Sequence, residues 1–181
     1  MKRCRGKISD GEKVYQGRRL WELAYLVFQD VNHQLFSESV KEEVTLGLPL
    51  SEGKKEELAG QVLRQMGLFD YKDCHPMSLS GGQKQRLAVA GAMASGKDLI
   101  VYDEPTSGLD YRHMEIVADM INDLSEKGKT QFIITHDPEL VERCCDRFLF
   151  LKNGKVECEG SWTKENTNRI RNYFGELAHT R

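Results

Sequence analysis

The strongest constraint on the fold of this chain is a strand–helix–strand pattern in its second half. Residues 99–102 form a continuous apolar run typical of a buried strand, and residues 131–135 are predicted to form the next strand. Between them, Asp110 is a predicted N-cap for a helix that reaches Lys127 and is closed by Gly128. Two strands joined by such a helix run parallel, with a right-handed crossover. The sequence therefore predicts an α/β fold built on a parallel sheet.

Polar residues follow the strands of this predicted sheet. Asp103 and Glu104 come directly after the first strand, and His136 follows the second. Gln29 follows an earlier apolar run, residues 25–28, which also predicts a strand. The carboxyl ends of parallel strands share one edge, and open α/β sheets bind ligands at that edge. We therefore expect these four polar residues to cluster there.

A glycine turn precedes the helix that we predict over residues 83–94. The turn, Ser80-Gly81-Gly82-Gln83, would point unpaired backbone N–H groups at an anion, with help from the helix dipole. Taken alone, this tetrapeptide is an ordinary glycine turn. It stands, however, before an apolar strand that ends in an acid pair, and a nucleotide site needs one carboxylate for Mg²⁺ and one for water. Together the two features indicate a nucleotide site.

Length and charge narrow the class of protein. A chain of 181 residues suits one domain with a sizeable core, and a mean hydropathy of −0.55 argues against a membrane span. The net charge of −2 gives no basic surface for nucleic acid. Five cysteines without C-x-x-C spacing, and no signal peptide, favour reduced thiols in a cytosolic protein.

The rest of the chain is predicted to add helices and a hairpin. The segment from about 34 to 77 is predicted to be a small helical lobe, with helices at 39–48 and 52–66. A further helix is predicted to begin with Asp137 as its N-cap and Pro138 at its first position. Asn153-Gly154 predicts a hairpin between two short strands, 147–152 and 155–160. Residues 161–181 are predicted to form a C-terminal helical tail.

The motifs occur in an order that resembles the ABC-type ATPases over most of the chain, from about Gly6 to Gly160. The matching motifs are the signature (Leu79-Ser80-Gly81-Gly82-Gln83), Walker B (residues 99–104), the D-loop (residues 107–110), the switch histidine (His136) and the Q-loop (Gln29). The resemblance implies a P-loop-NTPase-like parallel sheet core with a small helical lobe. Within the family, the chain looks most like the ATPases of energy-coupling-factor transporters, which import vitamins and cobalt or nickel ions.

The resemblance also implies a role for each of these residues toward ATP and Mg²⁺. Asp103 would hold Mg²⁺ through water, and Glu104 would be the general base or would orient the attacking water. His136 would contact the γ-phosphate, while Gln29 would join the metal site and link it to the membrane subunit. Asp110 would reach across a dimer interface. The signature residues would grip the γ-phosphate of ATP bound to a partner subunit: Ser80, Gly81, Gly82 and Gln83.

The partners implied are a second ABC ATPase subunit, in a homodimer or heterodimer, and a transmembrane transporter subunit, with no nucleic acid. The chain would then be cytoplasmic and peripheral, at the inner face of the cell membrane. Leu35 and Phe36 are candidate apolar anchors for the transmembrane partner, and the alternative for both is the core of the helical lobe.

One motif of the family is missing from this sequence. A P-loop needs G-x-x-x-x-G-K-[ST] between a strand and a helix. The near-match at residues 91–97 is followed by Asp98, and a predicted helix leads into it while a strand leaves it, so we interpret it as an ordinary loop. In this family the P-loop precedes the stretch that resembles residues 6–11. We therefore expect an N-terminally truncated ABC domain that is inactive alone; the sequence leaves the reason open.

Three functions fit these features to different degrees. The chain is either an ATPase subunit that powers import or a non-catalytic module that lends its signature to a partner ATPase. The C-terminal ATPase lobe of a chromosome-maintenance protein also lacks a P-loop, but Gln29 and a helical insert before the signature disfavour it.

Overall fold

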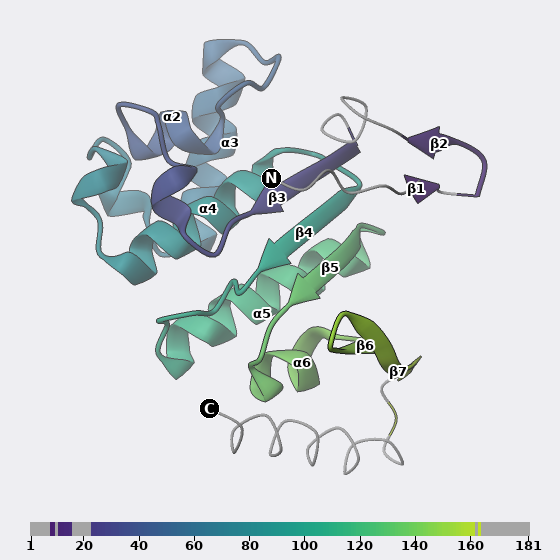
Figure 1. Ribbon diagram of the computed structural model, residues 1–181. Helices are drawn as coiled ribbons and strands as arrows, with labels where there is room; N and C mark the ends of the chain where they lie inside the picture. Colours follow the sequence, from purple (N-terminus) through teal and green to yellow (C-terminus); the bar gives the residue numbers. More distant parts are fainter. Residues whose placement is uncertain (1–7, 10, 16–22, 162, 164–181) are drawn as a thin grey trace.

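A three-stranded parallel sheet forms the centre of the protein (Figure 1). The computed structural model describes residues 8–9, 11–15, 23–161 and 163. The strand order is β3 (Ala24–Val27), β4 (Leu99–Asp103) and β5 (Thr130–Ile134), and both pairs of neighbours are parallel. Helix α5 (Tyr111–Glu126) connects β4 to β5 and has Asp110 as its N-cap. The predicted parallel strand–helix–strand unit and the α/β class are confirmed.

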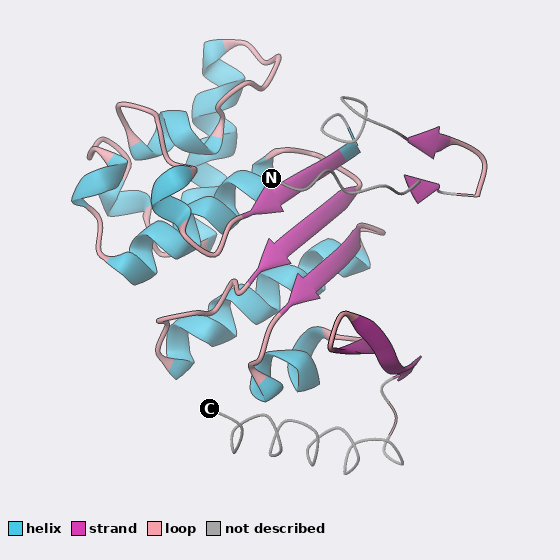
Figure 2. Ribbon diagram, in the orientation of Figure 1, coloured by secondary structure: helices cyan, strands magenta, loops and turns pink. Residues whose placement is uncertain are grey.

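Two helices cover one face of this sheet. Helix α4 (Gly81–Ala94) and helix α5 lie on the same side of the strands (Figure 2), and Ile100 and Tyr102 of β4 are fully buried in the core they share. Helix α4 approaches β3 closely at Gly91. A Cβ atom on Gly91 would lie 2.5 Å from the Tyr25 hydroxyl oxygen, so any larger residue here would require the Tyr25 side chain to move. The small residues of α4 thus allow it to pack closely against the sheet.

A helical segment, residues 31–78, lies between β3 and α4. It contains η1 (Val31–His33), α2 (Val40–Val44), α3 (Glu52–Gln65), η2 (Phe69–Tyr71) and η3 (Pro76–Ser78). Its buried residues, among them Val40, Leu63 and Leu68, belong to the same continuous core as Leu87 of α4. Helix α4 therefore packs against both the sheet and the helical segment.

Helix α2 is shorter than the 39–48 helix expected from the sequence. It begins after Ser39, whose hydroxyl accepts from the Glu42 amide, and it ends at Val44. The chain then turns through Gly47, which has a left-handed φ of 72°. That backbone conformation is incompatible with a continuing α-helix, so the helix stops before Pro49 is reached.

The C-terminal half continues from β5 into helix α6 (Pro138–Cys144) and an antiparallel hairpin, β6 (Arg147–Lys152) with β7 (Lys155–Ser161). Asn153 and Gly154 both have positive φ, at 52° and 74°, as a type I′ hairpin turn requires. A second short antiparallel pair joins β1 (Ile8–Ser9) to β2 (Val14–Tyr15). The tail predicted for 161–181 lies outside the described residues, apart from Ser161, which ends β7, and Thr163.

The near-match to a P-loop at residues 91–97 lies between α4 and β4, as predicted, but only its last three residues are loop, because residues 91–94 are the end of α4. Gly96 turns the chain with a φ of 67°, and β4 begins at Leu99. Asp98, at the position where a P-loop has its serine or threonine, pairs with Lys129 at 2.7 Å. This ion pair holds the loop against the start of β5.

Candidate functional site at the carboxyl edge of the sheet

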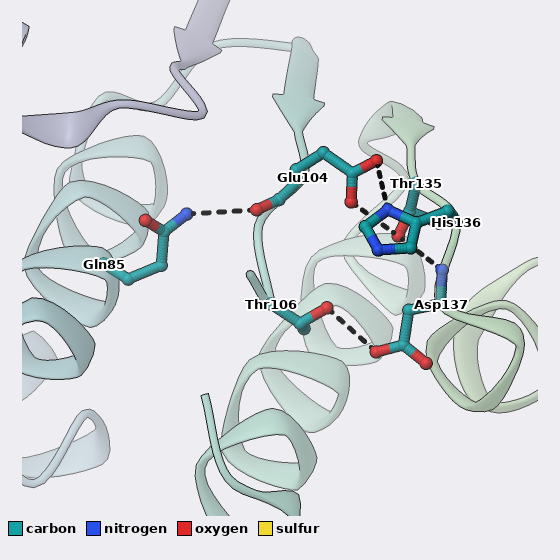
Figure 3. Close-up of polar contacts among 6 residues, drawn as sticks. All are labelled: Gln85, Glu104, Thr106, Thr135, His136 and Asp137. Atoms are coloured by element: carbon teal, nitrogen blue, oxygen red, sulfur yellow. Dashed lines mark hydrogen bonds and ion pairs between the residues drawn. The ribbon is translucent and has the colours of Figure 1, made fainter. Parts of the chain in front are cut away.

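Glu104 and His136 meet where β4 and β5 end (Figure 3). The Nδ1 atom of His136 lies 2.7 Å from Oε1 of Glu104, although the residues are 32 positions apart. The Glu104 side chain is 15% exposed and that of His136 is 55% exposed. An ionised carboxylate only accepts hydrogen bonds, so Nδ1 is the donating nitrogen. The other ring nitrogen, Nε2, can then accept in the neutral ring or donate in the imidazolium.

Glu104 has an unusual backbone conformation that its neighbours hold in place. Its φ is +50°, in the left-handed region that residues other than glycine rarely adopt. The Glu104 amide donates to the Ile134 carbonyl at 2.8 Å, and the Glu104 carbonyl accepts from the Ser107 amide at 3.1 Å. Such a conformation costs about 1–3 kcal/mol and survives only where the surroundings impose it. The side chain is thereby aimed across the strand ends toward His136.

A polar network extends from this pair to the start of helix α6. The Thr135 hydroxyl donates to Oε2 of Glu104 at 3.3 Å and accepts from the Asp137 amide at 3.0 Å. Asp137 caps α6 and accepts a hydrogen bond from the buried Thr106 hydroxyl at 2.9 Å. The turn after β4 and the turn after β5 are therefore fixed relative to each other, as Figure 3 shows.

Sequence reasoning selected Glu104 and His136, which the structure brings together, and missed several residues that contact Glu104 or its neighbours. Gln85 is buried in α4, and its Nε2 lies 3.5 Å from the Glu104 carbonyl oxygen. No pattern in the sequence distinguishes it from other polar residues of a helix. Thr106 and Thr135 each lie next to a predicted site motif in the sequence. That proximity is the feature that could have identified them as site residues. Asp137 was predicted as the α6 cap, which is confirmed, and its second bond to Thr106 was not predicted.

Asp103 and Gln29 lie at the same edge of the sheet. Asp103 is the last residue of β4 and is half-buried, and Gln29 is an exposed residue two positions after β3 ends. Gln34 fixes the turn that carries Gln29: its Oε1 accepts from the Phe28 amide at 3.0 Å, and its Nε2 donates to the Leu26 carbonyl at 3.1 Å. Carboxylate and amide oxygens are the ligands that Mg²⁺ prefers, together with waters and substrate phosphates. The side chains present thus fit a magnesium ion that shares its coordination with a nucleotide.

The predicted signature forms the start of α4. Ser80 is the N-cap: its hydroxyl oxygen accepts from the Gln83 amide at 3.3 Å, while Oε1 of Gln83 accepts from the Ser80 amide at 2.8 Å. The helix begins at Gly81, two residues before the predicted start at Gln83, because this reciprocal cap allows it to. The amides of Gly81 and Gly82 have no acceptor within the helix. Ser80 and Gly81 are exposed, and Gly82 is half-buried.

Asp110 is fixed at the start of α5, in the predicted N-cap position. Its Oδ1 accepts from the His113 amide at 2.9 Å and lies 2.8 Å from His113 Nδ1. The backbone hydrogen bond from His113 is the largest cause that lowers the pKa of Asp110 below its ordinary value. The side chain remains two-thirds exposed and ionised, so it is available to a partner surface.

No helix within the described ranges is both long enough and apolar enough to cross a membrane.

Comparison with known proteins places these residues in a family context. The family model described as ABC transporter matches residues 2–107. An ABC transporter ATP-binding protein of Treponema denticola is 43% identical over 162 residues, covering 89% of this chain and 32% of the relative. The energy-coupling factor transporter ATP-binding protein EcfA of Methanothermobacter thermautotrophicus is 35% identical, covering 85% of this chain and 52% of the relative. The chain spans about a third to a half of the length of these relatives.

Solved structures give the same result. The ATP-binding cassette MJ0796, in a dimeric post-hydrolysis state with ADP and phosphate, is matched with a TM-score of 0.69 and 30% identity, over 76% of this chain and 62% of that chain. The cassette cbiO1 of Clostridium perfringens, part of the transporter complex cbiONQ, is matched with a TM-score of 0.66 and 30% identity, over 90% of this chain and 68% of that chain. Since the family model alone covers more than half of the residues, this chain belongs to the ABC transporter family.

Proposed function

We propose that this chain is part of an ATPase subunit that powers an importer of the energy-coupling-factor type, taking up a vitamin or a transition-metal ion. The observation that carries the proposal is the Glu104–His136 pair at the carboxyl edge of the sheet, with Asp103 beside it. The importer type is supported by the names of two relatives, EcfA and the cbiO1 cassette of the complex cbiONQ.

In this proposal, each residue of the site has a separate task toward bound ATP. Glu104 orients the attacking water and accepts its proton. His136 keeps Nδ1 on Glu104 and presents Nε2 to the γ-phosphate. To hold both partners at once the ring must donate from both nitrogens, which requires the imidazolium. Its positive charge then also offsets the charge that develops on the phosphate oxygens.

Mg²⁺ and the signature complete the chemistry. Asp103 and Gln29 would hold the Mg²⁺ of Mg–ATP, and the ion would neutralise charge on the phosphates. Ser80, Gly81, Gly82 and Gln83 would meet the γ-phosphate of ATP on a second subunit, with Asp110 at the same subunit contact. Because Oε1 of Gln83 is engaged by the Ser80 amide, we assign the phosphate contacts to the glycine amides and the Ser80 hydroxyl.

The partners follow from these assignments. We propose a second ABC ATPase subunit, identical or different, and a transmembrane subunit at the cytoplasmic face of the membrane. The sequence contains no G-x-x-x-x-G-K-[ST] stretch between a strand and a helix, and the amides and lysine of that loop supply most phosphate affinity. The 181-residue chain should therefore bind and hydrolyse ATP only within an assembly.

The test is ATP turnover with and without partners. The chain is purified alone, and also after co-expression with the transmembrane subunit and a second ATPase subunit of an energy-coupling-factor importer. We expect phosphate release only from the complex, and a strong reduction by Glu104→Gln. If the complex with Glu104→Gln turns over ATP as fast as wild type, the chain is the alternative, a non-catalytic module that lends its signature to a partner.

A further inference from the structure

We propose that Cys144 and Cys145 form a chelating dithiol, which binds a soft, thiophilic centre with two open coordination positions, a trivalent arsenical. The site is independent of the ATPase function proposed above. It lies at the opposite end of α6 from the turn that carries His136 (Figure 1). Three observations carry the proposal: the two thiols contact each other, the backbone that bears them is held on both sides, and both thiols are partly accessible.

The first observation is the contact between the two thiols. Adjacent residues of a continuous helix point about 100° apart, so their side chains diverge. Here α6 ends between them: Cys144 is its last residue, and Cys145 is its C-cap with an extended backbone, at φ of −108° and ψ of 128°. The two thiols are hydrogen-bonded to each other. Two sulfurs this close can bind the same atom in a bent chelate.

The second observation is the support of the backbone. Within α6, the Cys145 amide donates to the Val141 carbonyl at 3.1 Å. From α5, Nδ2 of Asn122 donates to the Arg143 carbonyl at 3.3 Å, and the Arg143 guanidinium pairs with Glu115 at 2.6 Å. The end of α6 is therefore fastened to α5 without the help of the thiols. A ligand would find the two sulfurs already placed, which lowers the entropic cost of binding.

The third observation is the environment of the sulfurs. Cys144 and Cys145 are both free and half-buried, and Sγ of Cys144 donates to the Leu140 carbonyl at 3.1 Å. Thiolate sulfur is a soft ligand that selects soft centres, whereas Mg²⁺ prefers oxygen. Cys158 is also a free, half-buried thiol but has no cysteine next to it in the sequence, so it is a natural comparison.

The binding reaction balances without an oxidant or a reductant. A monoaryl arsenic(III) dihydroxide has two hydroxyl groups that exchange for sulfur. Each thiol forms one sulfur–arsenic bond, and its proton leaves with the displaced hydroxide as water. Two water molecules are released, and arsenic and sulfur keep their oxidation states. The product is a ring closed by arsenic across the two cysteines.

The experiment uses the full 181-residue chain, kept reduced by a phosphine so that no other thiol competes. The chain is titrated with a monoaryl arsenical and then treated with iodoacetamide. Intact mass gives the stoichiometry, and peptide mass spectrometry shows which thiols escape alkylation. We expect one arsenical per chain, with Cys144 and Cys145 protected together and the exposed Cys74 alkylated. Alkylation of Cys144 and Cys145 at saturating arsenical overturns the proposal.

Single variants test whether both sulfurs are used. Cys144→Ser and Cys145→Ser should each weaken binding about a hundredfold or more, because the second sulfur binds as an intramolecular partner. The matched control is Cys158→Ser, which removes a half-buried thiol and should leave binding unchanged. Circular dichroism establishes that the variants are folded. If either variant of the pair binds as tightly as wild type, another thiol of the chain is the ligand and the proposal fails.

Thermal unfolding separates a site built by the fold from mere adjacency in the sequence. Neighbouring cysteines can also chelate arsenic in the unfolded chain, and a ligand raises the Tm only when it binds the folded state more tightly. We expect the arsenical to raise the Tm of wild type and of Cys158→Ser, and to leave that of Cys145→Ser unchanged. An unchanged or lowered Tm for wild type would show that the fold does not build the site, and would overturn the proposal.

Discussion

Lys84, in the first turn of α4, donates a hydrogen bond from Nζ to Oδ1 of Asn32 at 3.1 Å, across 52 positions of sequence. Asn32 lies in η1, directly after the turn that carries Gln29. The bond joins the start of the predicted signature helix to the predicted Q-loop turn. A displacement of that turn would therefore strain or break this hydrogen bond at the start of α4.

A double-mutant cycle on this pair should give a small coupling energy in the free chain. Asn32 is exposed and Lys84 half-buried, so we expect a coupling of about 1 kcal/mol or less for Asn32→Ala with Lys84→Met. The measurement is the free energy of unfolding in urea for the two single variants and the double variant. Strict additivity would mean that the bond contributes nothing in solution.

Glu104→Gln should separate hydrolysis from nucleotide-dependent assembly. Glutamine keeps the size of the side chain but cannot accept a proton from water, so ATP turnover in the assembled complex should fall by about 10²–10⁴-fold. Assembly in the presence of ATP should persist, because the phosphate contacts of the signature are untouched. Phosphate release measures turnover, and light scattering measures assembly. Thr135→Ala is the comparison, since it removes only one bond to Glu104.

Gly81→Asp should abolish ATP-dependent pairing with a P-loop-bearing ABC subunit whose own Walker B glutamate is disabled. A Cβ on Gly81 meets nothing within 4 Å, and an acid in the first turn of a helix favours folding. The negative charge of the new aspartate would face the γ-phosphate of the partner's ATP and repel it. It would thereby oppose the hydrogen bonds from the signature to that phosphate, which are worth roughly 1.5–3 kcal/mol each.

The neighbouring glycine is a poorer position for this test. A Cβ on Gly82 would lie 3.2 Å from Cδ2 of Leu109, so a change there also disturbs packing. Gly81→Ala is the control for Gly81→Asp, because it adds a Cβ without charge. Equal light scattering by Gly81→Asp and wild type in the presence of ATP would show that this chain does not use its signature toward a partner.

Leu35 and Phe36 are adjacent residues that should respond in opposite ways to alanine. Leu35 is 6% exposed and part of the core, whereas Phe36 is 74% exposed. The buried Glu43 holds this turn, since its Oε2 accepts from the Phe36 amide at 2.8 Å and the Ser37 amide at 2.7 Å. Leu35→Ala should lower the free energy of unfolding by about 2–5 kcal/mol.

Phe36→Ala should leave that free energy nearly unchanged and weaken association with a transmembrane subunit, because an exposed aromatic side chain is a typical interface anchor. Pull-down of the transmembrane subunit in detergent measures the association. Unchanged association would remove Phe36 as the anchor.

Sequence alone predicted the strands and helices whose signals are local. The Asp110 cap, the Asn153-Gly154 turn and the alternation of β4 with α5 and β5 depend on residues close in sequence, and the structure confirms them. The bond between Glu104 and His136 could be expected only because parallel strands end at one edge. Gln85 and Thr106 could not be predicted, since their partners are set by how α4 and α6 pack against the strand ends.

The exposure of one side of β5 could also not be predicted from the sequence. The sequence predicts a strand at residues 131–135, and nothing in its residues says which of its two faces is exposed among the described residues. Only the register with β4, together with the 61% exposure of Phe132, shows which side is open.

The loss of folding stability at acid pH should depend in part on Asp110, the N-cap of α5. The pKa of Asp110 is lowered from 3.8, chiefly by the His113 amide and further by the His113 side chain and the charge of Arg86. A lowered folded-state pKa means that the unfolded chain takes up the proton first as pH falls. The stabilisation is therefore fully present above pH 3.8 and is lost as the pH falls through the lower folded value.

Asp110→Asn isolates this contribution, because asparagine caps a helix as well as aspartate and does not titrate. Between about pH 5 and pH 3, wild type should lose more free energy of unfolding than Asp110→Asn, as measured by urea denaturation at each pH. The difference should persist in about 1 M salt, since its largest cause is a hydrogen bond and not a screened charge. Parallel losses in the two proteins would show that the Asp110 cap does not contribute to the pH dependence of folding.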